Sequence, residues 1–138
     1  VVLCARLPGR LAVEVVPGVT SVTACAARAG VPLVARNERL EVLPGTLPED
    51  ELAARIGGAE AVAVMKVGRH LGKIRRVLAG LGLEGRAVYV ERATLREEVV
   101  LPLADAPEKA PYFSMILGYR GAEPGIRDAV IQRRETAQ

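Results

Sequence analysis

The sequence predicts an α/β fold in which helices flank a mixed, mostly parallel sheet. Short runs of β-branched and other apolar residues alternate with segments whose apolar residues recur at helical spacing. Pro and Gly stand at the boundaries of most of these segments. Strands joined by helices pair in parallel through right-handed crossovers. The last apolar runs follow one another without a helix, so we expect these strands to be antiparallel.

Local signals justify each predicted element of the first half. A β-branched run over residues 13–16 stops at a Pro-Gly pair and predicts a strand that enters a sharp turn. The alanine-rich stretch 21–29 predicts a helix, because hydroxyl side chains precede it and Gly follows it. A second strand is expected at 40–43. The next helix opens at Pro48, with acidic residues at the positive end of its dipole, and ends at a Gly pair.

The second half contains one more helix and four strands. Residues 61–65 are all apolar, as expected of a strand that is buried on both faces. Apolar residues recur at helical spacing over 71–81 and predict an amphipathic helix. The remaining predicted strands cover residues 87–90, 99–103 and 113–117.

Composition excludes several classes of protein. The 138 residues are 50% hydrophobic and 3% aromatic, so a core of Ala, Val and Leu is expected. No run approaches the roughly 18 apolar residues of a membrane span. Cys4, Cys25 and the single histidine cannot form a Cys/His zinc site. We expect reduced, partly buried thiols instead, which fits a cytoplasmic protein.

The net charge is slightly basic, at +3 with the histidine neutral. Nucleic-acid binding is disfavoured, because three Tyr and one Phe offer few platforms on which bases could stack. An anionic small molecule explains the basic excess at least as well.

Polar groups gather in the turn after the first predicted strand. The segment Pro17-Gly18-Val19-Thr20-Ser21 leaves free N–H groups and two hydroxyls at the start of a helix. Such a turn can bind a carboxylate or a phosphate. The alternative is that Thr20 and Ser21 only cap the helix.

Basic residues follow the apolar strand at 61–65. Between residues 66 and 76 there are five basic side chains and no acid. Two arginines at the end of this stretch are typical of a solvated helix face, whereas Lys66, Arg69 and His70 precede the helix and fit that alternative less well. The carboxyl end of a strand is where open α/β sheets hold their ligands. A lone histidine is nevertheless more typical of a structural residue than of a catalytic one.

Two further turns carry candidate ligand contacts. Ala93 follows a strand, and its small side chain would let a ligand approach the backbone, although an ordinary turn is the alternative. Tyr112 and Phe113 precede the last strand and could stack on a ligand or fill the core. No segment contains a catalytic signature such as a Ser/His/Asp set, paired carboxylates or a Walker loop.

The four segments together resemble one family. The signature that opens the second half of the tetrapyrrole methylases resembles the segment VEVVPGVTSVTACAARAGVPL. Later strands of the same family domain resemble AVAVMKVGRHL, AVYVERAT and PYFSMILG. The resemblance implies a C-terminal α/β domain at 17–120. It also implies the end of a missing N-terminal domain at 1–16 and a surface helix or tail at 121–138.

The resemblance implies a methyltransferase that uses S-adenosylmethionine as methyl donor, without a metal. The family holds this donor in the cleft between two α/β domains and forms homodimers. The substrate implied is a precorrin-type tetrapyrrole on the pathway of cobalamin biosynthesis. Motif by motif, the residues implied to bind the cofactor are Thr20, Ser21, Met65, Ala93 and Phe113.

Lys66 and Arg69 are our addition to the residues that the resemblance implies. A tetrapyrrole of this kind carries many carboxylates, and a basic rim would hold them. The sequence identifies no catalytic base.

The Gly-rich loop and the Gly-Asp motif of the family's first domain are absent from these 138 residues. We therefore expect little or no methyl transfer from this chain alone. The alternative function is a catalytically inactive fragment that serves only as a dimerising or anion-binding α/β module.

Overall fold

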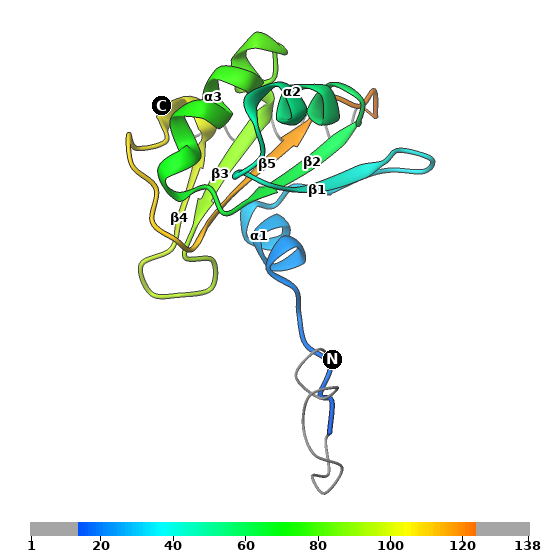
Figure 1. Cartoon of the computed structure of the whole chain (residues 1–138). Coiled ribbons are helices and arrows are strands. Elements are labelled where there is room, and N and C mark those ends of the chain that lie inside the picture. Colours follow the sequence, from blue (N-terminus) through cyan, green and yellow to red (C-terminus); the bar gives the residue numbers. More distant parts are fainter. Residues whose placement is uncertain (1–13, 124–138) are drawn as a thin grey trace, which may run out of the picture.

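The computed structural model describes residues 14–123. Within them the chain forms a sheet of five strands with helices on both faces (Figure 1). The α-helices are α1 (Ser21–Ala29), α2 (Glu49–Gly57) and α3 (Leu71–Gly80). The strands are β1 (Leu40–Pro44), β2 (Ala61–Met65), β3 (Ala87–Glu91), β4 (Val99–Pro102) and β5 (Ser114–Tyr119). The α/β class predicted from the sequence is confirmed.

The order of strands across the sheet is β1-β2-β5-β3-β4. β1 and β2 are parallel, whereas β5 is antiparallel to both β2 and β3, and β4 is antiparallel to β3. The sheet is therefore mixed, as expected. The prediction that it is mostly parallel is wrong, because only one of its four pairs of neighbouring strands is parallel. The physical reason is that β5 inserts between β2 and β3. Because β1, β2 and β3 still run in one direction, their carboxyl ends lie at the same edge.

Two apolar cores stabilise the sheet, one on each face. α2 and α3 cover one face, where they pack on side chains such as Leu52, Ile74 and Ile116. α1 covers the opposite face, where Cys25 and Ala29 pack against Val88. Burial of these apolar side chains on both faces supplies the main driving force for folding.

The predicted helix boundaries agree with the observed caps. The Oγ1 atom of Thr20 accepts a hydrogen bond from the N–H of Thr23 at 3.3 Å, which caps α1. Gly30 ends α1 with a φ of 65°, a left-handed conformation that glycine adopts without steric cost. Pro48 lies one residue before α2, and Glu49 begins an acidic first turn, as the dipole argument predicts.

The strand predicted at 13–16 is not formed by the residues of that range that the structure describes. Residues 14–16 have no regular structure, and the side chains of Val15 and Val16 are exposed. A β-branched run forms a strand only where a neighbour supplies hydrogen-bond partners, and no described strand lies beside this one. The boundaries of the last two strands also shift, since β4 ends at Pro102 and β5 runs to Tyr119.

Some predictions fall outside residues 14–123. They concern Cys4, most of the segment 1–16 and most of the tail at 121–138. Cys25, in contrast, is buried as a free thiol, as expected. Of the described helices, none has the length and apolar character that a membrane crossing requires.

Candidate functional site

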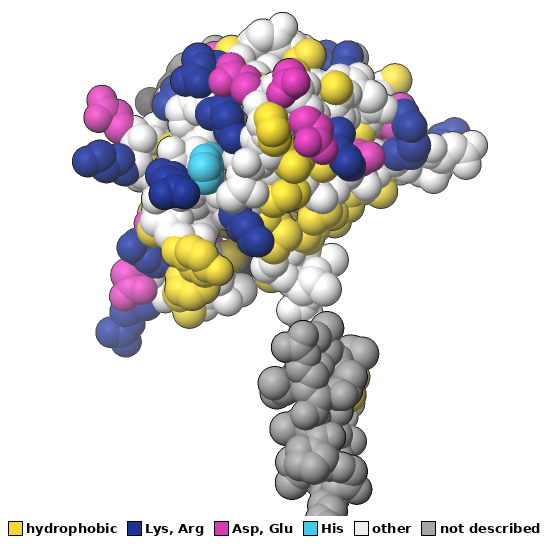
Figure 2. Space-filling model, in the orientation of Figure 1, with side chains coloured by type: hydrophobic (Ala, Val, Ile, Leu, Met, Phe, Trp, Pro, Cys, Tyr) yellow, Lys and Arg dark blue, Asp and Glu magenta, His cyan; other side chains and the backbone are white. Residues whose placement is uncertain are grey.

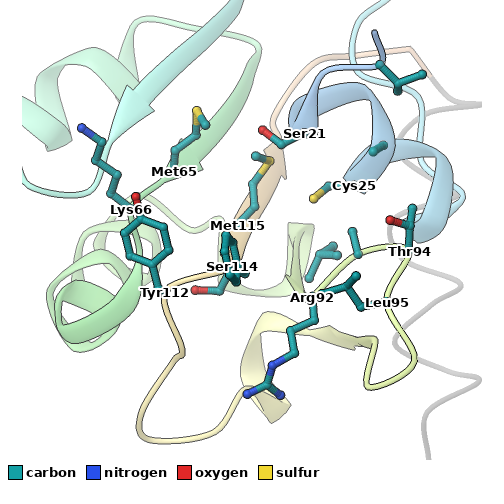
Figure 3. Close-up of a pocket in the computed structure, with 15 residues that line it drawn as sticks. Ser21, Cys25, Met65, Lys66, Arg92, Thr94, Leu95, Tyr112, Ser114 and Met115 are labelled. Carbon is teal, nitrogen blue, oxygen red and sulfur yellow. The ribbon is translucent and has the colours of Figure 1, made fainter.

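A hollow of 630 Å³ opens where the carboxyl ends of β2 and β3 meet the start of β5 (Figure 3). α1 forms its opposite wall, with Ser21 and Cys25 one helical turn apart on the same face. The lining residues are Val19, Ser21, Ala24, Cys25, Met65, Lys66, Val90, Arg92, Ala93, Thr94, Leu95, Tyr112, Phe113, Ser114 and Met115. The hollow lies at the edge of the sheet where open α/β folds hold ligands. We call it the main hollow.

Backbone strain is concentrated around the main hollow. Lys66, directly after β2, has a φ of 55°. Arg92 and Thr94, in the loop after β3, have φ values of 48° and 70°. Among residues 14–123 only one other non-glycine residue, Arg36, has a positive φ. Each such residue costs on the order of 1 kcal/mol, and strained residues of this kind cluster at ligand sites.

A close approach of two backbone segments holds the turn after β2 in place. The N–H of Gly45, at the end of β1, donates to the carbonyl oxygen of Met65 at 2.6 Å. A Cβ atom at Gly45 would lie 2.8 Å from Cδ1 of Ile74 and 3.2 Å from the carbonyl oxygens of Met65 and Lys66. A side chain at position 45 would therefore require the end of Ile74 and the carbonyl groups of Met65 and Lys66 to shift.

Glu98 links the loop after β3 to α1 by hydrogen bonds. Its carboxylate accepts hydrogen bonds from Nε of Arg28 at 2.7 and 2.8 Å and from the N–H of Thr94 at 2.6 Å. On the other side of the loop, the N–H of Arg92 donates to the carbonyl oxygen of Phe113 at 2.8 Å. The loop thus connects three walls of the main hollow.

A buried polar cluster lies at the end of β3, beside the start of β5. The hydroxyl of Tyr89 donates to Oε2 of Glu91 at 2.8 Å, and Nη1 of Arg92 donates to Oε1 of Glu91 at 2.5 Å. Figure 3 shows the Arg92 side chain directed away from Ser21 and Cys25, so its charge is used for Glu91 and does not enter the hollow.

This cluster gives a testable pH dependence. Burial, and then the hydrogen bond to Glu91, raise the pKa of Tyr89 above its ordinary value near 10. A raised pKa in the folded state gives stability that is complete below pH 10 and is lost as the pH rises above it. We expect the free energy of unfolding to fall above pH 10, and Tyr89→Phe to make that fall less steep. Urea unfolding measured from pH 8 to pH 11.5 checks this.

Tyr112→Phe is the matched control for this series, because the Tyr112 side chain is 77% exposed. It should keep the pH dependence of the unsubstituted protein. If Tyr89→Phe and Tyr112→Phe behave alike, the Tyr89 hydroxyl does not govern alkaline stability.

The lining of the main hollow is mainly apolar and rich in sulfur. Figure 3 shows Cys25 and Met115 pointing into the same space, with Met65 on the neighbouring strand. Burial, and then the charge of Glu98, raise the pKa of the Cys25 thiol, which keeps it protonated and a poor nucleophile. An apolar hollow with few polar groups is suited to binding and orienting a ligand by shape.

The structure brings together most of the residues singled out in the sequence. Ser21, Met65, Lys66, Ala93 and Phe113 all line the main hollow. Thr20 does not line it, and its hydroxyl caps α1, as the alternative interpretation has it. Arg69 lies in a neighbouring hollow described below.

Sequence reasoning missed several lining residues. Cys25 could have been found, because it lies four residues after Ser21 and so on the same helix face. Met115 lies two residues after Phe113, on the same side of the chain as it enters β5. The sequence predicts only a partly buried thiol for Cys25 and does not single out Met115, since apolar side chains in a sequence do not distinguish a core from the lining of a cavity.

A second, smaller hollow of 330 Å³ adjoins the first. Its lining residues are Thr46, Lys66, Gly68, Arg69, His70 and Tyr112. Lys66 and Tyr112 line both hollows and form the wall between them.

Comparison with known proteins gives concordant results. The family model of the tetrapyrrole (corrin/porphyrin) methylases matches residues 2–107. The chain is 49% identical over 124 residues to a precorrin-2 C(20)-methyltransferase of Sinorhizobium sp, a match that covers 89% of this chain and 49% of that protein. It is 48% identical over 113 residues to the cobalamin biosynthesis protein CobIJ of Mycobacterium tuberculosis, covering 81% of this chain and 22% of that protein.

Solved structures of the same kind share the fold. A cobalt precorrin-4 methyltransferase superposes with a TM-score of 0.62 at 25% identity, covering 77% of this chain and 51% of that one. A uroporphyrin-III C-methyltransferase of Thermus thermophilus, complexed with S-adenosylhomocysteine, gives a TM-score of 0.53 at 29% identity and covers 76% and 52%. The matches cover between 22% and 52% of the length of these proteins, so the chain spans only part of each of them.

Proposed function

The chain belongs to the tetrapyrrole (corrin/porphyrin) methylases, and we propose that it forms the donor-binding part of an S-adenosylmethionine-dependent methyltransferase. The observation that carries this proposal is the main hollow itself. Five residues singled out in four separate segments of the sequence line one apolar cavity at the carboxyl ends of β2 and β3.

The lining fits a ligand with an apolar, flat portion and a sulfur atom. Ala24 and Ala93 leave space close to the backbone, and Met65 and Met115 offer polarizable thioethers. Phe113 and Tyr112, in edge-to-face contact with ring centroids 5.2 Å apart, are exposed at the rim and can pack on a ring. The Ser21 hydroxyl adds a hydrogen-bonding group on the α1 side.

S-adenosylmethionine, when bound, supplies a methyl group on a positively charged sulfur that a carbon nucleophile can attack directly. The part of these residues is to orient the donor and to exclude water from it. Ser21, Met65 and Ala93 fix the donor from α1, β2 and the loop after β3. Lys66 and Arg69 would hold carboxylates of the methyl acceptor at the rim. No residue of this chain is assigned as a base.

The substrate and the reaction follow from the relatives and are part of the proposal. Two of the similar proteins are named as methyltransferases of precorrin-2 or cobalt-precorrin-2 at C-20. We propose C-methylation of a precorrin-type tetrapyrrole in cobalamin biosynthesis, with the C-20 position as the specific site.

The place of this chain in the enzyme is also proposed. The four motifs resemble the second half of the family, so we assign 17–120 to a C-terminal domain, 1–16 to the end of the preceding domain and 121–138 to a tail. The family match begins at residue 2 of this chain and does not itself say which half of a longer relative the chain represents. A homodimer in the cytoplasm completes the proposal.

Titration of S-adenosylhomocysteine by calorimetry tests the proposal. We expect the complete gene product to bind it with a Kd in the micromolar range and residues 1–138 alone to bind much more weakly. Such a pair of results supports a donor site that this chain shares with another domain. Absence of binding to the complete gene product would overturn the proposal in favour of an inactive dimerising or anion-binding module.

A further inference from the structure

The second hollow differs from the main one in its charge. Of its six lining residues, two are cationic, one is the single histidine, one is a threonine and none is an acid. Lys and Arg side chains gather on the face of the molecule that carries the histidine, beside an apolar patch (Figure 2). Its volume of 330 Å³, about half that of the main hollow, suits a substituent of a ligand and not a whole macrocycle.

The side chains of the two cations in this hollow have no partner among residues 14–123. Lys66 and Arg69 make no hydrogen bond and no ion pair among the described residues, and both line the hollow. The basic residues that follow them differ. Arg76 pairs with Glu49 at 2.8 Å, Lys73 donates to the carbonyl oxygen of Leu47, and Arg75 donates to the carbonyl oxygens of Ala104 and Ala106. The cations at the end of the basic stretch are therefore held by protein groups, whereas the exposed side chains of Lys66 and Arg69 are accessible to a ligand.

Neutral polar groups complete the hollow. Removal from water, and then the charges of Lys73 and Arg69, lower the pKa of His70, so its imidazole is neutral at neutral pH and can donate one hydrogen bond. The Thr46 side chain adds a hydroxyl from the loop after β1. Two cations together with two neutral donors match the needs of a carboxylate, which only accepts hydrogen bonds.

The two hollows are adjacent, because Lys66 and Tyr112 belong to the lining of both. In Figure 3 the side chain of Lys66 points away from Cys25, while Tyr112 stands beside the Lys66 backbone. A ligand seated against the main hollow can thus extend a side arm past Tyr112 towards Lys66 and Arg69.

Charge decides which ligand supplies the carboxylate. The methyl donor carries an α-ammonium group and a sulfonium in addition to its carboxylate. Neither hollow is lined by an acid that could balance such cations. At the second hollow, the two cations therefore favour an acceptor whose charged groups are all carboxylates over a donor that carries two cationic groups.

We propose that the second hollow binds an acetate or propionate carboxylate of the tetrapyrrole, and that Lys66 and Arg69 are specificity-determining residues for the methyl acceptor. This inference rests on the proposed function, since it takes the main hollow as the donor site. It adds a discrete pocket, with Thr46 and His70 as its neutral donors, to the basic rim expected from the sequence.

The test uses the complete gene product and two separate binding measurements. Uroporphyrin, a stable tetrapyrrole with acetate and propionate side chains, is titrated with fluorescence detection, and S-adenosylhomocysteine is titrated by calorimetry. We expect Lys66→Met and Arg69→Met each to weaken uroporphyrin binding about tenfold, as for loss of one charge-assisted hydrogen bond. Binding of S-adenosylhomocysteine should stay within about twofold in Arg69→Met, because Arg69 does not line the main hollow. Arg86→Met is the matched control, because Arg86 lies at the opposite end of β3 and also lacks a partner among the described residues.

The possible outcomes separate the two proposals. Unchanged uroporphyrin binding in both variants overturns the inference, while S-adenosylhomocysteine still reports on the donor site. A parallel loss of both ligands in Lys66→Met and Arg69→Met also overturns it, because the hollow would then hold the carboxylate of the donor. If the unsubstituted protein binds no S-adenosylhomocysteine, the proposed function is refuted, and the inference, which rests on it, is refuted with it.

Discussion

Replacement of Met65 by Asp is expected to weaken S-adenosylhomocysteine binding by more than about 100-fold, or about 2.7 kcal/mol. Met65 is half-buried at the end of β2, and its side chain lines the main hollow. An aspartate there would place a charge, or a carboxyl group without partners, against an apolar ligand surface. The folded protein alone should lose only about 1 kcal/mol, because solvent reaches the side chain while the hollow is open. Calorimetric titration and urea unfolding of the same preparation of the complete gene product measure the two effects.

Met65→Leu is the control for shape and apolarity. It should retain binding within a few-fold, since the two side chains have similar volumes. If Met65→Asp instead lowers affinity and stability by equal free energies, Met65 is only a core residue and its part in a donor site is refuted.

The helices and strands were predictable because their signals are local. Gly30 ends α1, the acidic turn after Pro48 opens α2, and the uniformly apolar run of β2 needs no information from elsewhere in the chain. The place of β5 in the sheet was not predictable in this way. It depends on the fit of Ile116 between Val64 and Tyr89, two residues far apart in the sequence.

The candidate site was predictable to the extent that it lies at strand ends. Met65 ends a predicted strand, Lys66 and Ala93 follow predicted strands, and the topology brings those ends to one edge. The sequence did not decide whether Thr20 binds a ligand or caps the helix, because a hydroxyl group before a helix is suited to both roles. The sequence singled out Lys66, Arg69 and His70 of the second hollow but not Thr46, which a distant loop supplies. It also did not show that Lys73 and Arg75 donate to backbone carbonyls of distant loops.

Ile116→Ala is expected to lower the free energy of unfolding by about 3–4 kcal/mol, the range for truncation of a fully buried aliphatic side chain. Ile116 is fully buried at the centre of the sheet, in register with Val64 on β2 and Tyr89 on β3, and beneath α2 and α3. The cavity left by truncation would lie between two strands and two helices, where little can collapse to fill it. Urea unfolding followed by circular dichroism measures the loss.

The control for this substitution lies on the edge strand. Val42→Ala on β1 removes apolar atoms from a side chain that is 48% exposed, so it should cost less than about 1 kcal/mol. The comparison tests the strand order, because Ile116 at an edge would have one neighbouring strand and a correspondingly smaller effect. A loss near 1 kcal/mol for Ile116→Ala would therefore contradict the insertion of β5 between β2 and β3. Such a result would also contradict the position of Ser114 and Met115 in the main hollow, because these two residues begin β5.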